Sequence, residues 1–183
     1  MDKIDKLLNK IIPPIARQDG IDREWFNNEE ILTKLNDEEL KIVEKRLIVM
    51  LKTSDDSLIP QTLIQFKSLD SIPTMLERLA LIKDPFSRIT WASFIDEINN
   101  GDEAMEKIAF EELKKLEFIY EIQGVIFQDL IKFNSLRINN RIATFVNHKY
   151  FLVAQHAKEF LNLNNHKPIR KESARNRWWG FWK

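Results

Sequence analysis

The sequence predicts an all-α protein whose helices pack in pairs. Glycine and proline are scarce, with four Gly and six Pro among 183 residues, so few sharp turns interrupt the chain. Apolar residues recur at helical spacing, rather than alternating as they do in a half-buried strand. The starts of three expected helix pairs, near Glu39, Ser71 and Asp102, are separated by 32 and 31 residues.

Composition indicates one globular domain and disfavours several function classes. The chain is 44% hydrophobic and 31% charged, which is typical of a soluble protein. Its 28 basic and 28 acidic residues give zero net charge, which disfavours a nucleic-acid binder that is basic throughout. The sequence contains no cysteine, which excludes disulfides, cysteine–zinc sites and cysteine catalysis.

The amino-terminal residues predict a cytoplasmic protein. Residues Met1–Asp19 contain three aspartates and lack the basic start and apolar stretch of a secretory signal. No apolar run approaches the roughly eighteen residues of a membrane-spanning helix. Residues 1–35 are expected to cap the helical stack, with a helix at Lys3–Ile12, a stop at Pro13-Pro14, a loop at Ala16–Arg23 and a short helix at Glu29–Leu35.

Capping residues predict the helices of the central region. Asn36 with Glu39 resembles a capping box, and Asp84 followed by Pro85 is a strong helix start. Ser71 is expected to cap the helix that carries Pro73 in its first turn. The first predicted helix begins after Asn36 and extends to Leu51, and the next ones cover Ser57–Leu69, Ser71–Ile82 and Asp84–Ile98. Asn99-Asn100-Gly101 is expected to end the last of these helices.

Four further helices are predicted toward the carboxyl end. They are Asp102–Tyr120, Gln123–Phe133, Arg137–Val146 and Tyr150–Leu161. A β-hairpin over Ile142–Val153 is the alternative, because Asn147-His148-Lys149 would close it. The helical spacing of Val153, Ala157 and Leu161 favours the helix.

Two segments resemble HEAT repeats. In Ser71–Asn99, a helix containing Met-Leu-Glu-Arg-Leu, a Lys-Asp-Pro turn and a helix containing Arg-Ile-Thr-Trp-Ala-Ser-Phe-Ile follow the HEAT order, and Arg137–Leu161 is a second partial match. Small residues three positions after apolar ones let adjacent helices approach closely. The resemblance implies a short right-handed α-solenoid of stacked antiparallel helix pairs over residues 36–163, and a binding role.

No motif predicts catalysis, a bound metal or a cofactor. The three histidines, His148, His156 and His166, lack zinc-protease and di-iron spacing, and no phosphate-binding glycine loop or serine-nucleophile motif occurs. The carboxylate pairs Asp96-Glu97 and Glu111-Glu112 are expected on solvated faces, because neighbouring helical residues point in different directions. An enzyme is the minor alternative, with Trp91, Tyr120 and Asp96 as its candidate residues.

The carboxyl-terminal tail, within residues 164–183, is unusually basic and aromatic. Residues 166–183 hold six basic residues and one acidic residue, a net charge of +5. Three tryptophans and Phe181 occupy four of the last six positions. The tail is expected either to pack back on the helical body or to bind a protein, a membrane surface or nucleic acid.

The function predicted most strongly is a non-enzymatic protein–protein interaction module. A bacterial immunity or antitoxin-type protein that masks a toxin is the narrower hypothesis. Acidic helix faces would attract a basic protein partner. The alternative is a nucleic-acid- or membrane-associated protein that uses the tail. The predicted partner-binding residues are Glu77, Glu111, Glu112, Arg177, Trp178, Trp179 and Trp182.

Overall fold

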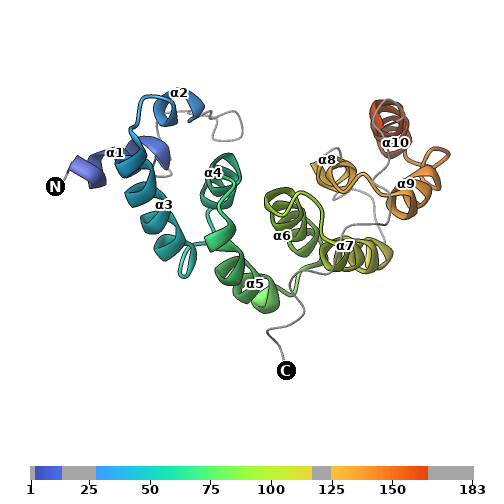
Figure 1. The fold of residues 1–183 in the computed structure, drawn as a ribbon. Helices are drawn as coiled ribbons and strands as arrows, with labels where there is room; N and C mark the ends of the chain where they lie inside the picture. The colour runs from blue at the N-terminus through green and yellow to red at the C-terminus, as the bar shows by residue number, and fades with distance from the viewer. Residues whose placement is uncertain (1–2, 14–27, 117–124, 165–183) are drawn as a thin grey trace. The chain divides into compact units, whose positions relative to one another are not determined.

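The computed structural model describes residues 3–13, 28–116 and 125–164, and within these ranges the chain is all-α (Figure 1). The described residues form ten α-helices and one 3-10 helix, and they contain no strand. This confirms the all-α part of the predicted fold class, whereas the solenoid of antiparallel helix pairs stays a prediction. The chain divides into two compact units, residues 1–78 and 79–183, with the division inside a helix.

The first unit is organised around α3. Its helices are α1 (Lys3–Ile11), α2 (Glu29–Leu32), α3 (Asp37–Leu51), α4 (Leu58–Phe66), the 3-10 helix η2 (Leu69–Ser71) and most of α5 (Ile72–Leu81). Helix α3 packs against α1 and α4, and α1 also contacts α2. The residues that α3 buries, Val43, Leu47 and Leu51, are four positions apart and therefore form a single stripe.

Buried polar contacts join three helices of this unit. The side-chain amide of Asn28, at the start of α2, donates to Thr62 Oγ1 on α4 at 2.7 Å and to the Ile11 carbonyl of α1 at 3.4 Å. The Thr62 hydroxyl donates to the Leu58 carbonyl at 2.7 Å. These bonds satisfy polar groups that would otherwise be buried without a partner.

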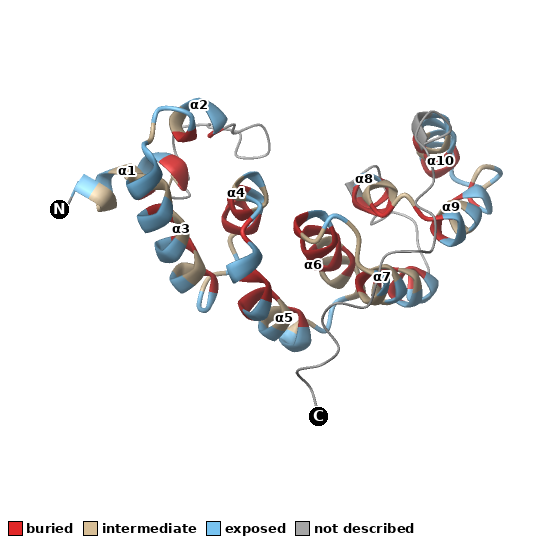
Figure 2. Cartoon of the chain, in the orientation of Figure 1, coloured by how far each residue is buried: buried red, intermediate tan, exposed pale blue. Residues whose placement is uncertain are grey.

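The second unit is organised around α6. It contains α6 (Pro85–Ile98), α7 (Glu103–Lys115), α8 (Val125–Lys132), α9 (Leu136–Ala143) and α10 (Phe151–Asn164). Helix α6 packs against α7 and α8, and α10 packs against α8 and α9. Phe127 of α8 is fully buried, and its ring lies 6.0 Å from those of Phe145 and Phe160. Figure 2 shows how extensively α6 is buried.

Three predicted helix starts are confirmed by their hydrogen bonds. Asn36 and Glu39 make both bonds of a capping box at the start of α3. Asp84 accepts from the Ser87 amide at 2.7 Å, and Asp102 accepts from the first amides of α7. Each carboxylate satisfies amides that have no partner within their own helix.

The predicted end of α6 is also confirmed. Asn100 and Gly101 follow the helix with positive φ angles of 53° and 113°. This left-handed backbone ends helical hydrogen bonding, and glycine tolerates it best.

Two predictions, that Ser71 caps a helix and that a helix covers Ser57–Leu69, were wrong in detail. Helix α4 ends at Phe66, because Lys67 takes a left-handed conformation with φ 52°. The chain then forms η2, which includes Ser71. Ser71 Oγ therefore donates to the Ser68 carbonyl at 2.7 Å, whereas a cap would accept from α5.

The hairpin alternative is wrong, and several helices are shorter than predicted. Helix α9 ends at Ala143, hydrogen-bonded turns follow, and α10 begins at Phe151, so Ile142–Val153 contains no strand. Helix α7 ends at Lys115, with Leu116 in extended backbone, and α8 covers Val125–Lys132. Tyr120 and residues 165–183 lie outside the described residues.

None of the described helices combines the length and the apolar character needed to cross a membrane. The predicted division into 1–35, 36–163 and 164–183 stays a prediction.

Candidate partner-binding surface

Two carboxylates expected on solvated faces are buried in the second unit. The residues Asp96 and Glu112 are 1% and 4% exposed, respectively. Asp96 Oδ1 accepts from the Asp102 amide at 2.6 Å, where α6 turns into α7. Glu112 Oε1 accepts from Arg88 Nε at 2.7 Å. Because a buried charge needs a close partner, these contacts explain how both carboxylates are accommodated.

Arg88 joins three helices through this network. Its Nη1 donates to the Leu79 and Ile82 carbonyls at 2.9 and 3.0 Å, at the carboxyl end of α5. The Leu79 carbonyl belongs to the last turn of α5, where intrahelical donors run out, and the Ile82 carbonyl follows directly after that helix. Lys115 Nζ donates to the second Glu112 oxygen at 2.8 Å. The Arg88–Glu112 pair therefore holds α6 between the end of α5 and α7.

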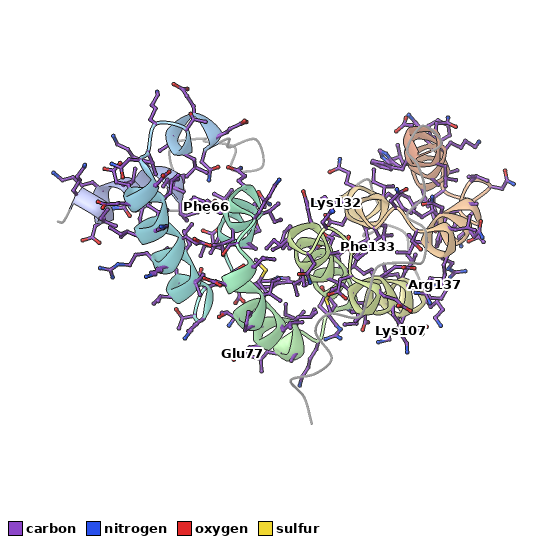
Figure 3. All side chains as sticks on the ribbon, viewed as in Figure 1. Phe66, Glu77, Lys107, Lys132, Phe133 and Arg137 are labelled. Carbon is purple, nitrogen blue, oxygen red and sulfur yellow. The ribbon has the colours of Figure 1, made fainter. Side chains whose placement is uncertain are left out.

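A third buried carboxylate, Asp129, lies between α6 and α8. Thr90 Oγ1 donates to Asp129 Oδ2 at 2.7 Å, and Lys132 Nζ donates to Oδ1 at 3.1 Å. Lys132, labelled in Figure 3, also lies 3.7 Å from Glu97. These contacts give Asp129 a structural role between neighbouring helices.

An open depression lies between α7 and α9. It has a volume of about 490 Å³ and is lined by Phe110, Leu136, Arg137, Asn140 and Arg141. We call these five residues the α7–α9 surface. Leu136 is 57% exposed and lies beside an aromatic ring and two guanidinium groups.

Ser135 and Glu106 position α9 against α7. Ser135 Oγ donates to Glu106 Oε1 at 2.5 Å, and Arg137 Nη2 donates to the same oxygen at 3.1 Å. The Ser135 hydroxyl also caps α9 by accepting from the Ile138 amide at 3.4 Å. The two helices are therefore joined at the first turn of α9, beside the depression.

Cations gather around the aromatic ring of this surface. The Arg137 guanidinium carbon lies 4.8 Å from the Phe110 ring centroid, and Lys114 Nζ lies 5.1 Å from it. Figure 3 labels Lys107 on α7 and Arg137 on α9, two neighbouring helices of this unit. The Arg141 guanidinium carbon lies 5.3 Å from the Phe145 ring centroid. Arg141 Nε is buried and has no hydrogen-bond partner among the described residues.

The same cations act on Glu111. Lys114 Nζ lies 2.5 Å from Glu111 Oε2, and this hydrogen bond lowers the pKa of Glu111 below its ordinary value of 4.5. The charges of Arg137 and Lys107 lower that pKa further. Glu111 is therefore ionised at neutral pH, and its negative charge is offset by its neighbours.

The predicted partner-binding residues lie in different environments. Glu77 is exposed on α5 (Figure 3), whereas Glu111 is exposed on α7 and paired with Lys114. Glu112 is buried in the Arg88 network. Arg177, Trp178, Trp179 and Trp182 lie outside the described residues. Partner binding by these seven residues stays a prediction.

Sequence reasoning missed the α7–α9 surface. Arg137 and Arg141 are four residues apart and share one face of α9, whereas Ile138 and Ile142 are fully buried. That spacing was visible in the sequence. The position of Phe110 beside them was not, because it depends on how α7 and α9 pack.

The candidate residues for an enzyme are placed as follows. Trp91 and Asp96 are both buried on α6, and Tyr120 lies outside the described residues. His148 Nδ1 accepts from the Tyr150 amide at 3.3 Å, and His156 Nδ1 lies 3.4 Å from Glu159. In the part of the chain that the structure describes, no three or more histidine or carboxylate side chains form a group able to hold a metal ion.

The ten described helices are consistent with the helical-repeat architecture inferred from the sequence. The specific resemblance to HEAT repeats stays a prediction. No family model matches the chain, and searches of curated proteins and solved structures gave no significant match.

Proposed function

We propose that this chain is a non-enzymatic binding protein that docks one partner protein through the α7–α9 surface. The depression between two helices is the observation that carries the proposal. It is lined by an aromatic ring, an exposed leucine and two guanidinium groups. These groups belong to α7 and α9, which are joined by the contacts of Glu106. Aromatic residues and arginine are enriched at protein interfaces and at their energetic centres.

The architecture proposed for this role is a HEAT-like α-solenoid of antiparallel helix pairs over residues 36–163. The repeated capping residues and the packing of α6 against α7 support it. A cytoplasmic immunity or antitoxin-type protein that masks a toxin is the narrower form of the same proposal. In each form the helices supply a preorganised surface, which lowers the entropic cost of association.

Photocrosslinking tests the location of the interface. The full chain is expressed in its native host with a benzophenone amino acid at Leu136 in one sample and at Val49 in another. Both residues are exposed, at 57% and 60%, but Val49 lies on α3 in the other unit. We expect one stoichiometric protein adduct from position 136 and none from position 49.

Two results would overturn this proposal. One is a stoichiometric adduct at position 49 with none at position 136, which would place the interface elsewhere. The other is the absence of any stoichiometric protein adduct at 136 in a correctly folded sample. Far-ultraviolet circular dichroism of each labelled protein establishes that it is folded.

The composition of the tail favours a second candidate function. With a charge of +5 and three tryptophans, residues 166–183 are suited to an anionic lipid surface or to single-stranded nucleic acid. Binding to anionic vesicles or to an oligonucleotide should weaken steeply with salt and be lost when 166–183 are deleted. Unchanged binding after that deletion would exclude the tail as the site.

A further inference from the structure

Among the arginines that pack against described helices of this unit, Arg141 makes no ion pair with a described residue. Arg88 donates to Glu112 and to two carbonyls, and Arg137 donates to Glu106. Arg78 pairs with Asp55 and donates to the Lys52 carbonyl, although its own Nε is unpaired. Arg141 makes no ion pair with any described residue, and its Nε–H is buried without an acceptor. Because Arg141 also lines the open depression, its guanidinium is a group that an incoming anion would meet there.

The charge around the depression favours an anion. Lys107, Lys114, Arg137 and Arg141 stand against Glu106 and Glu111, and both carboxylates are already engaged by these cations or by Ser135. Neither Lys107 nor Arg141 makes an ion pair with a described carboxylate, and of these two cations Arg141 is the one that lines the depression. An incoming carboxylate would form a charge-assisted hydrogen bond, the strongest class available to arginine in proteins.

The rest of the depression is suited to an apolar group. Leu136 is 57% exposed and lies beside Phe110 on the same lining. Lys114 and Arg137 already lie over the Phe110 ring, so a stacked nucleobase would have to displace a cation. A leucine-sized side chain contacting Leu136 requires no such displacement. This favours a protein segment over single-stranded nucleic acid.

We infer that the α7–α9 surface recognises an acidic segment of a partner protein, with a carboxylate on Arg141 and a neighbouring apolar side chain on Leu136. This inference rests on the proposed function and names the chemistry of the partner at that surface. It replaces the basic partner expected from the acidic residues of α7, because Glu111 and Glu112 are both paired within the chain.

Peptide binding by the full chain tests the inference. The probes are a fluorescein-labelled peptide of three Glu-Leu repeats and its counterpart of three Gln-Leu repeats, compared by fluorescence anisotropy. We expect the glutamate peptide to bind at least about tenfold more tightly, as one charge-assisted hydrogen bond implies. Arg141→Gln should remove that difference, and the Arg141 Nε–H resonance of the wild-type protein should shift on titration.

Arg46→Gln is the matched control, because Arg46 is exposed on α3 in the other unit. It removes the same charge and should leave the preference for glutamate unchanged. Equal affinity for the two peptides would overturn the inference. Equal losses of the glutamate preference in Arg46→Gln and Arg141→Gln would also overturn it. So would an oligothymidine that displaces the labelled glutamate peptide at a lower concentration than the unlabelled peptide requires.

The two proposals fail in distinguishable ways. A protein adduct at position 136 together with equal peptide affinities would retain the docking site and reject its acidic specificity. A glutamate preference that depends on Arg141, without any adduct at 136, would retain the anion site and reject the docked partner.

Discussion

The two sides of α7 use charge in opposite ways. The side toward the core buries Met105, Ala109, Glu112 and Leu113, and its carboxylate is held by Arg88 and Lys115. The other side carries Phe110 under Lys114 and Arg137, next to an open depression. The buried carboxylate is therefore paired within the fold, whereas Arg141 of α9, which lines the depression beside α7, makes no ion pair with a described residue.

Removing Arg88 should have the largest effect on stability. Arg88→Met leaves Glu112 buried with Lys115 as its remaining partner and takes the donor away from two carbonyls at the end of α5. We expect a loss of about 3–5 kcal/mol in the free energy of unfolding, the usual range for breaking a buried pair. Urea unfolding followed by circular dichroism measures it.

A double variant sharpens that test. Arg88→Met with Glu112→Met replaces both charges with apolar groups, so the cost should be well below the sum of the two single changes. Strictly additive losses would mean that the pair is not a coupled unit in solution.

Removing the cap of α7 should have an intermediate effect on the free energy of unfolding. Asp102→Ala deprives the Ala104 and Met105 amides of their acceptor, and we expect a loss of about 1 kcal/mol. Asp102→Asn retains an acceptor oxygen and serves as the control. Equal losses in the two variants would show that charge, rather than capping, is what matters at this position.

Removing Arg141 should barely change stability. Arg141→Gln breaks no ion pair among the described residues, so we expect a change within about 0.5 kcal/mol by the same urea assay. A loss approaching that of Arg88→Met would give Arg141 a structural role and remove the contrast between the two sides of α7.

Acid should produce the smallest effect, through Glu111. Because the pKa of Glu111 is lowered in the folded chain, its stabilising contribution is present above the ordinary value of 4.5 and is lost as the pH falls through the folded pKa. Glu111→Gln should therefore be slightly less stable than the wild type at pH 7, and the difference should shrink as the pH falls below 4.5. A difference in stability that does not shrink as the pH is lowered would contradict this origin.

Local features of this fold were predictable, and long-range ones were not. The caps at Asn36, Asp84 and Asp102 depend on residues within three positions, so the sequence displays them directly. The left-handed Lys67 escaped prediction because lysine is not a residue that favours positive φ.

The candidate site was harder to predict, because it depends on helices that meet only after folding. Arg88 and Glu112 are 24 residues apart, and Ser135 is 29 residues from Glu106. The four-residue spacing of Arg137 and Arg141 predicts a shared helix face, but nothing local to α9 indicates that one guanidinium is paired and the other is not.

The turn between α6 and α7 has a consequence for the kinetics of recognition. Asp96 accepts the Asp102 amide, its carbonyl accepts the Gly101 amide at 2.9 Å, and the Asn99 side chain donates to Asp102 at 2.8 Å. Because these hydrogen bonds order the turn before binding, the backbone at the start of α7 is preorganised. Association with a partner would therefore not be limited by a slow rearrangement of α7.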